Sequence, residues 1–313
     1  MLSNFSKQEW DKKVIELNGS ILQSWDWGEF QNAHGLKVHR LMDSEFAAQV
    51  LETPLISSKK YLYVPRGPLG NLDLAMADLK ALATKDRDVV FARIEPSVAV
   101  NLPKAAKETQ PTHNWLVDLE PSEPEILTSM KPKTRYNINL ASRKGVVIGE
   151  GGAGDLIDVY KLLLETAGRN NFRLHPQNYY VQMRENLSRD NLRILIAEYA
   201  GKPLATMFLT MFGTTATYLH GGSSQAMKDV MAPYLLHWEA MKLAKKMGYK
   251  YYDLGGIAPN DANPEHAWSG ISRFKKSFGG FELVYPGSFE MIFSPLWYNV
   301  YTNARKLRNI IRK

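Results

Sequence analysis

The sequence predicts a mixed α/β fold, with α+β mixed sheets, in two tandem domains. The chain has 313 residues, which is more than most single domains contain. Helix and strand patterns follow one another in a similar order in each half. Pro121, Pro124 and Pro132 interrupt a polar segment at about 120–133, between the two halves. Together these three observations predict two domains of comparable length.

The first half contains amphipathic segments and short apolar runs of the lengths expected for helices and strands. We place this first domain at 1–125. Its predicted helices are 8–17, 25–33 and 74–84, and its predicted strands are 38–42, 47–51, 61–64, 89–94 and 114–119.

In the second half, the ends of the predicted helices and strands are more clearly marked. Asp155 precedes an amphipathic pattern, as helix-capping residues do. Breaks at 201–203 and 213–214 are short enough for hairpins, and Gly248 ends a long helical pattern. The predicted order is a strand at 144–148, helices at 155–164 and 179–187, strands at 192–199, 204–212 and 215–220, a helix at 232–247, a strand at 251–254, a helical turn around Phe274, and a final hairpin at 281–285 and 288–293.

This order resembles that of N-acetyltransferase-like (GNAT) domains, and the first half is a looser version of it. We place the second domain at 126–295, with a cleft between the two domains. The last helix, 296–313, is expected to pack on the first domain. Acetyltransferases hold the coenzyme A pyrophosphate on a glycine-rich turn that opens the long helix. Residues 223–231 lack such a turn, which argues against acetyl-coenzyme A.

Composition and charge restrict the kinds of site, location and partner that the protein can have. The chain contains no cysteine, which excludes disulfides, thiolate metal sites and a cysteine nucleophile. The amino terminus has no secretory pattern, and no stretch approaches about 20 consecutive apolar residues, so we expect a cytoplasmic protein. The net charge of +7 favours phosphate-bearing partners such as nucleic acid, nucleotides or an anionic membrane. Many soluble proteins carry this charge without such a partner, so charge alone leaves both interpretations open.

Six runs place polar or charged side chains at strand ends or helix starts, where α/β proteins build their sites. They are 23–28, 63–68, 133–141, 218–224, 253–257 and 274–280. The most specific are KTRYNI at 133–138, YDLGG at 252–256 and FKKSFGG at 274–280. Together the runs resemble the Fem family (FemA-, FemB- and FemX-like) of peptidoglycan bridge aminoacyltransferases, over about residues 23–298.

The resemblance implies an enzyme that takes an amino acid from aminoacyl-tRNA, its co-substrate. The acceptor would be the stem-peptide amine of a cell-wall precursor, lipid II or UDP-MurNAc-pentapeptide, bound in the cleft. No metal and no organic cofactor are expected, because the tRNA ester already supplies an activated acyl group. Some members carry a long helical arm in the second domain. The short connections in this sequence indicate the armless type.

By the same resemblance, Lys275 stabilises the oxyanion or contacts the terminal phosphate of the tRNA, and Phe274 positions it by packing. Alternatively, Lys275 lies on a solvated helix face and Phe274 is a core residue. Asp253 could accept the proton or orient the amine, or it could cap the turn before Gly255.

Further substrate contacts are expected from Arg66, Arg135, Tyr218, His220, Trp27 and Arg273. Arginine binds phosphate through two hydrogen bonds, which suits Arg66 and Arg135. Arg135 could instead pair with a neighbouring carboxylate. A hydrogen-bonded structural role is the alternative for His220, and a place in the core is the alternative for Trp27.

Other functions stay open at this point. One is a coenzyme A-dependent N-acyltransferase of related fold. Another is a non-catalytic protein that binds tRNA or an envelope precursor. The basic segment 305–313 could rest on anionic lipid at the inner face of the membrane, or it could be an ordinary docking helix.

Overall fold

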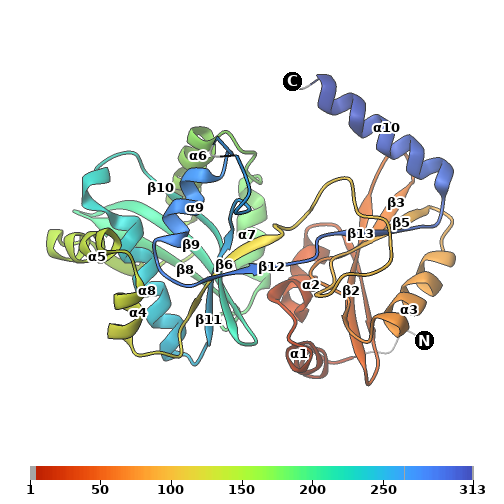
Figure 1. Cartoon of the computed structure of the whole chain (residues 1–313), viewed down its shortest axis with the longest axis horizontal. Coiled ribbons are helices and arrows are strands. Elements are labelled where there is room, and N and C mark those ends of the chain that lie inside the picture. The colour runs from red at the N-terminus through yellow and green to blue at the C-terminus, as the bar shows by residue number, and fades with distance from the viewer. Residues whose placement is uncertain (1–4, 264, 312–313) are drawn as a thin grey trace. The chain divides into compact units, whose positions relative to one another are not determined.

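The computed structural model describes residues 5–263 and 265–311, with side chains up to Lys306 (Figure 1). The chain forms two compact units. The first contains the residues up to Thr112 together with those from Tyr285 onward, and the second is His113–Val284. Each unit is built on its own sheet. Among the described residues, no helix is long and apolar enough to cross a bilayer.

The first unit contains a mixed sheet in which β3 and β5 are parallel and the other pairs are antiparallel. Its spatial order is β1 (Lys37–Met42), β2 (Phe46–Pro54), β3 (Lys60–Val64), β5 (Val89–Ile94) and β13 (Phe289–Ile292), with β4 (Leu69–Gly70) beside β2. Its helices are α1 (Lys7–Glu16), η1 (Ile21–Gln23), α2 (Trp25–Ala33), α3 (Leu72–Thr84) and α10 (Pro295–Ile311). Because α3 and α10 pack on β5, that strand is buried along its whole length.

The last helix, α10, lies on the first unit. The rings of Tyr298 and Tyr301 each lie 5.4 Å from the ring of Phe91. The Tyr298 hydroxyl also donates to the carboxylate of Glu290 on β13. These contacts hold the described part of α10 against the first unit. Most of the basic segment 305–313 lies outside the described side chains, which end at Lys306.

The second unit contains a seven-stranded sheet. Its spatial order is β12 (Phe281–Val284), β6 (His113–Asp118), β11 (Tyr251–Gly256), β10 (Thr215–Ser223), β9 (Lys202–Phe212), β8 (Leu192–Tyr199) and β7 (Val147–Glu150). Its helices are α4 (Glu123–Ser129), α5 (Pro132–Lys144), α6 (Leu156–Asn170), α7 (Gln177–Asn186), η2 (Lys228–Val230), α8 (Ala232–Lys246) and α9 (Ser269–Lys276).

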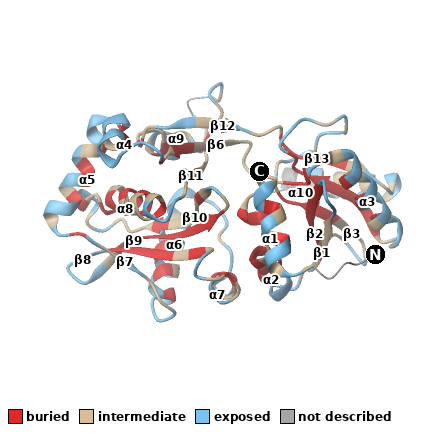
Figure 2. Ribbon diagram, turned by 90° about the horizontal axis from the view of Figure 1, so that it is seen from below, coloured by how far each residue is buried: buried red, intermediate tan, exposed pale blue. Residues whose placement is uncertain are grey.

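Helices cover both faces of this sheet. Strand β9 is buried from Leu204 to Phe212 and is red over most of its length in Figure 2. Its side chains alternate between the faces, so Met207 and Leu209 share one core cluster with α5 and α8. Phe208 points to the other face, where its ring lies 5.3 Å from that of Tyr180 on α7. The sheet is therefore the central layer of the unit.

The N-acetyltransferase-like order predicted for the second half is confirmed from β7 to β12. Strands β8, β9 and β10 form two antiparallel hairpins, and Gly201 and Gly213 occupy the turns with φ of +71° and +58°. After α8 the chain returns as β11, which is parallel to β10. A parallel pair requires such a crossover connection.

Several boundaries differ from the prediction. Strand β6 pairs with β11 and β12 and so belongs to the second unit, which begins at His113 rather than at 126. The expected final hairpin does not form, because β12 pairs with β6 in one sheet and β13 pairs with β5 in the other. Strand partners of this kind depend on contacts between distant segments, which local sequence patterns do not contain.

The polar segment at 120–133, where we placed the domain boundary, is largely helical. Ser122 and Glu125 form a capping box at the start of α4, and Pro132 occupies the first turn of α5. Helix α5 ends at Gly145, whose φ of +91° suits a left-handed cap. The predicted strand at 144–148 therefore begins only at Val147.

Candidate active site

The candidate site lies where β10 and β11 stop pairing. Their parallel register ends at Thr217 and Asp253, although both strands continue beyond that point. Two residues after Asp253, Gly255 has φ of +78°, a conformation that favours glycine. The turned backbone leaves the Gly256 carbonyl free to bind a side chain from α9.

Lys275 supplies that side chain. Its Nζ donates to the Gly256 carbonyl oxygen at 2.7 Å, and the residue is only 8% exposed. A Cβ at Gly255 would lie 3.5 Å from the same Nζ. The alternative that Lys275 belongs to a solvated helix face is therefore wrong. A buried ammonium group beside a strand end can act on a bound ligand.

The electrostatics of Lys275 are set by burial and by one carboxylate. Burial lowers its pKa from 10.5 to about 8, because the charged form loses hydration, while Asp253 raises it. At neutral pH the ammonium form still predominates. The site thus contains a poorly solvated positive charge, which interacts more strongly with a developing anion than a surface lysine does.

Asp253 is held by two hydrogen bonds. Its Oδ1 accepts from the Gly255 amide at 2.7 Å, and its Oδ2 accepts from Asn114 Nδ2 at 2.8 Å. The turn-capping role is therefore present. Asp253 also provides the nearby negative charge that favours protonated Lys275. Asn114 comes from β6, and no local sequence pattern indicated that it would reach this carboxylate.

Phe274 is part of an aromatic cluster behind Lys275. Its ring lies 5.1 Å from that of Tyr234 and 5.4 Å from that of His237, both on α8. It also meets Phe278 at 5.2 Å. These contacts fix α9 against α8, so Phe274 is a packing residue that orients the helix carrying Lys275.

His237 connects this cluster to β10 and β11. Its Nδ1 lies 2.8 Å from the Tyr252 hydroxyl, and its ring lies 4.7 Å from that of Tyr218. Burial, and secondarily the charge of Lys275, lowers the pKa of His237 to about 3. A neutral imidazole therefore lies beside Lys275. Burial raises the pKa of Tyr218 to about 12, so its hydroxyl also stays protonated.

His220 lies away from this centre, on the far side of a bulge in β10. Aromatic rings surround it, with Tyr180 at 5.3 Å and Tyr179 at 6.0 Å. Burial, together with His175, lowers its pKa to about 3. His220 is thus buried among aromatic rings, but its buried Nε2 lacks the hydrogen bond expected of a structural histidine.

In the second unit, the described contacts of Lys275 are with Gly256 and Asp253 and include neither Arg135 nor Arg273. Arg135 donates to the carbonyls of Thr128 and Met130, so it ties α5 to the end of α4 and pairs with no carboxylate there. Arg273 is exposed on α9. Both lie in the second unit.

Two other predicted contacts belong to the first unit. Arg66 donates to the Pro111 carbonyl at 2.7 Å, and its guanidinium lies 3.5 Å from the ring centre of Tyr285. Trp27 is 7% exposed and packs edge-on against Phe30 at 5.3 Å. Trp27 is therefore a core residue, whereas Arg66 is half-buried.

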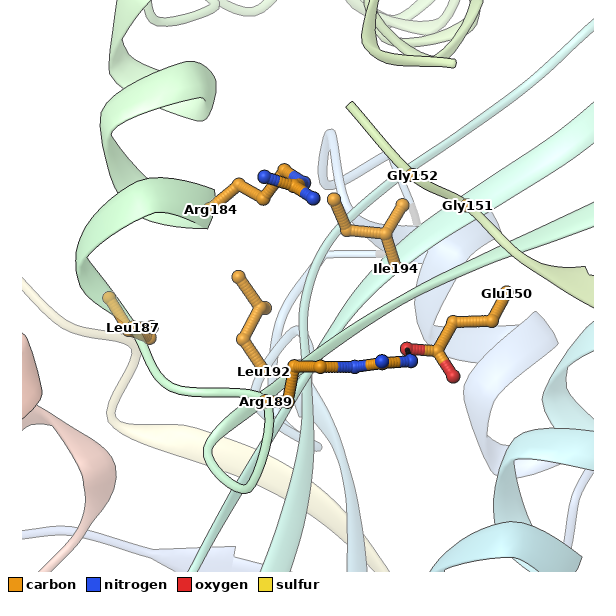
Figure 3. Close-up of a pocket in the computed structure, with 8 residues that line it drawn as sticks. All are labelled: Glu150, Gly151, Gly152, Arg184, Leu187, Arg189, Leu192 and Ile194. Atoms are coloured by element: carbon orange, nitrogen blue, oxygen red, sulfur yellow. Dashed lines mark hydrogen bonds and ion pairs between the residues drawn. The ribbon is translucent and has the colours of Figure 1, made fainter. Parts of the chain in front are cut away.

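A separate cavity of about 340 Å³ opens at the other edge of the second sheet (Figure 3). Its floor consists of the buried residues Leu187, Leu192 and Ile194. Arg189 reaches Glu150 at 2.9 Å along the rim, while Arg184 extends toward Ile194. None of the predicted site residues lines this cavity. No group of three or more potential metal ligands occurs in the part of the chain that the structure describes.

Comparison with known families identifies the fold. The profile of the FemAB family matches residues 102–200 and 189–306. The chain belongs to the FemAB family. A crystal structure of FemX superposes with a TM-score of 0.85 over 95% of this chain and 98% of that chain, at 18% sequence identity. The C-terminal domain of a putative lysylphosphatidylglycerol synthetase from Agrobacterium fabrum gives a TM-score of 0.59 at 12% identity, over 96% and 97% of the two chains.

Curated relatives of this FemAB protein are transferases. A UDP-N-acetylmuramoylpentapeptide-lysine N(6)-alanyltransferase of Weissella viridescens is 26% identical over 272 residues, which cover 76% of this chain and 80% of the relative. A lipid II:glycine glycyltransferase of Staphylococcus haemolyticus is 30% identical over 114 residues, or 36% of this chain and 27% of the relative. Among the described residues of the second unit, no helix exceeds the 15 residues of α6 and α8, as expected without an arm.

Proposed function

We propose that this FemAB protein transfers an amino acid from aminoacyl-tRNA to the stem-peptide amine of a peptidoglycan precursor. The precursor is UDP-MurNAc-pentapeptide or lipid II, the substrates named for two relatives. The observation that carries the proposal is the buried ammonium of Lys275 beside the end of β11, in a chain with the FemX fold. The product is the first or a later residue of the interpeptide bridge.

The reaction needs little more than positioning and charge stabilisation. The amine nitrogen attacks the ester carbonyl carbon, a C–N bond forms, and the carbonyl oxygen becomes negative. The C–O bond to the ribose then breaks, and the proton lost by the amine ends on the ribose hydroxyl. Lys275 stabilises the negative oxygen through its poorly solvated charge, an effect commonly worth about 10²–10³ in rate for one donor.

Among the described residues around Lys275, none is a strong base. Lys275 is mostly protonated below pH 8, His237 is buried with a pKa of about 3, and Asp253 accepts two hydrogen bonds. Direct proton transfer from the amine to the departing ribose oxygen therefore fits these residues best. We propose no dedicated catalytic base.

The start of α8 disfavours coenzyme A as the donor. Pro233 lies in its first turn and has no amide hydrogen to offer a pyrophosphate. Just before it, Asp229 carries a negative charge that is paired with Lys144. These features support an acyl donor other than coenzyme A, and no metal or organic cofactor enters the proposed reaction.

The proposed reaction takes place in the cytoplasm, where charged tRNA is available. A lipid-linked acceptor would require contact with the inner face of the membrane. The basic residues in 305–313 are suited to such contact with anionic lipid.

The decisive experiment mixes purified protein with each acceptor and a panel of charged tRNAs. Mass spectrometry should detect one precursor gaining one aminoacyl residue. A parallel reaction with acetyl-coenzyme A should give no product. Absence of transfer from every charged tRNA to either acceptor would rule out the proposed function.

A further inference from the structure

Asn114 places a buried amide in an interior strand of the second sheet. It pairs with Gly256 across β6 and β11, and it is 7% exposed. Asparagine is depleted in strands, and a buried amide needs hydrogen-bond partners. Only Nδ2 has one here, because the buried Oδ1 has no partner among the described residues. Such an acceptor lowers stability, so stability does not explain the choice of asparagine at this position.

The hydrogen bond that Asn114 does make leads to the candidate site. Its Nδ2 donates to Oδ2 of Asp253 at 2.8 Å, while the Gly255 amide donates to Oδ1 of the same carboxylate at 2.7 Å. Each oxygen of Asp253 therefore has a donor, and the two bonds together fix the orientation of the carboxylate. A side-chain amide suits this task because it donates without adding a charge.

The fixed orientation bears on the neighbouring ammonium group. Lys275 donates to the Gly256 carbonyl, and its described contacts include no direct ion pair with Asp253. If the carboxylate turned toward Nζ, the two charges would pair directly. The ammonium would then interact less strongly with a negative charge developing on a substrate, because Asp253 would already neutralise it.

We propose that Asn114 is a positioning residue of the transfer reaction, which holds the Asp253 carboxylate in place and so keeps the ammonium of Lys275 available to the oxyanion. This inference rests on the proposed function and adds a residue from β6 to it. Asn114 touches no reacting atom and acts through Asp253. Leucine at this position would bury no unsatisfied acceptor, but it would release the carboxylate.

The titration of Lys275 is a specific readout of this role. Burial lowers the pKa of His237 on α8 to about 3 and raises that of Tyr218 on β10 to about 12. Burial also raises the pKa of Tyr252 on β11 well above 10. None of these three groups changes charge between about pH 6 and 10. Other charged or titratable groups on β6, β12 and α9 are paired elsewhere or exposed: His113, Glu282, Lys276 and Arg273.

The test measures transfer and the titration of Lys275 in the same variants. Asn114→Leu should lower kcat about tenfold at neutral pH, part of the effect of losing a whole donor, and leave KM for both substrates unchanged. NMR of protein labelled with ¹³C at lysine Cε should show the Lys275 midpoint rising by about one pH unit, since a direct opposite charge favours the ammonium. The signal that disappears in Lys275→Met identifies Lys275.

A second substitution tests whether Asn114 acts through Asp253. In Asp253→Asn no carboxylate can pair with Lys275, so adding Asn114→Leu should change neither kcat nor the midpoint further. Asn186→Leu is the matched control, because the Asn186 amide donates to Gln182 within α7. This control should match the wild type in both measurements.

The two readouts separate this inference from the proposed function. An unchanged Lys275 midpoint in Asn114→Leu, or equal effects of that substitution with and without the Asp253 carboxylate, would overturn the positioning role. The NMR titration does not require turnover, so absence of transfer by the wild type would count against the function alone. Circular dichroism should confirm that the variants are folded, and Asn114→Ala serves in the same measurements if the leucine variant does not fold.

Discussion

At the scale of single residues, the burial of Lys275 links the catalytic role that we propose for it with the stability of the fold. Its charge loses hydration inside the protein, and this lowers its pKa to about 8. Between about pH 8 and 10.5 the unfolded chain therefore binds more protons at this position than the folded one. The free energy of unfolding consequently rises with pH through that window, and the full destabilisation is present below pH 8.

Lys275→Met should separate the two properties. Transfer should fall at least about a hundredfold, because the oxyanion loses its nearby charge. Stability at pH 7 should instead increase by up to about 3 kcal/mol, the equivalent of the pKa shift, less the lost hydrogen bond to Gly256. Rate assays and urea unfolding measure both effects. Lys276→Met is the control, since Lys276 is only half-buried and binds Asn260; equal losses of rate in both variants would contradict the assignment.

The pH profile of transfer should fall on the alkaline side with a midpoint near 8. Deprotonation of Lys275 removes the charge that stabilises the oxyanion, whereas protonation of the acceptor amine limits the rate at lower pH. Lys275→Arg should abolish the alkaline fall in its residual activity, because a guanidinium stays charged. An unchanged alkaline limb in that variant would show that another group titrates.

At the scale of elements, local pattern predicted most of the helices and strands. Residues 25–33, 89–94 and 192–199 have the predicted bounds, since clear apolar periodicity and turn residues mark their ends. Helices α4 and α5 were missed because Pro121, Pro124 and Pro132 were interpreted as marking a domain boundary. The site was predicted only in part: Phe274 and Lys275 came from the family motif. Asn114 could not be predicted, because its contact with Asp253 depends on the pairing of β6 with β11.

The structure explains why glycine occupies the last two positions of the FKKSFGG motif. Gly279 and Gly280 have φ of +75° and +94°, and a Cβ on Gly280 would lie 2.0 Å from the Leu116 carbonyl oxygen. These residues therefore allow the chain to leave α9 and enter β12 directly against β6. The motif combines the lysine that we propose to be catalytic with the turn that fixes its helix.

Gly280→Ala should destabilise the protein more than Gly248→Ala. Both glycines have positive φ, but a Cβ at Gly248 meets nothing within 4 Å. The strain common to both is about 1–2 kcal/mol. The clash with Leu116 should add at least about 1 kcal/mol for Gly280. Chemical denaturation measures the difference, and equal losses in the two variants would show that β12 moves aside freely.

At the scale of the whole molecule, the two units share the chain unequally. The second is one continuous segment, whereas the first needs both ends of the chain. A buried ion pair joins those ends, because Arg93 on β5 donates to Glu290 on β13 at 3.0 Å. The two residues are 5% and 1% exposed. Removing one partner of such a pair typically costs about 3–5 kcal/mol.

Fragments that correspond to the two units should differ in their ability to fold alone. Residues 113–284 should unfold cooperatively on their own, because they retain their complete sheet and core. Residues 1–112 alone should lack a cooperative transition, because Arg93 would be left unpaired beside an open strand edge. Addition of a peptide covering 285–313 should restore a cooperative unfolding transition to the 1–112 fragment, and circular dichroism measures this transition. A stable 1–112 fragment would show that β13 is dispensable.

The division of the first unit also sets an order of folding during synthesis. The ribosome releases residues 1–112 first. The edge of β5 nevertheless stays open until β13 has emerged, because β5 ends at Ile94 and β13 begins only at Phe289. The second unit is complete before that point. We therefore expect the middle of the nascent chain to reach its native state ahead of the beginning. The unpaired edge of β5 is then the segment most in need of protection by a chaperone.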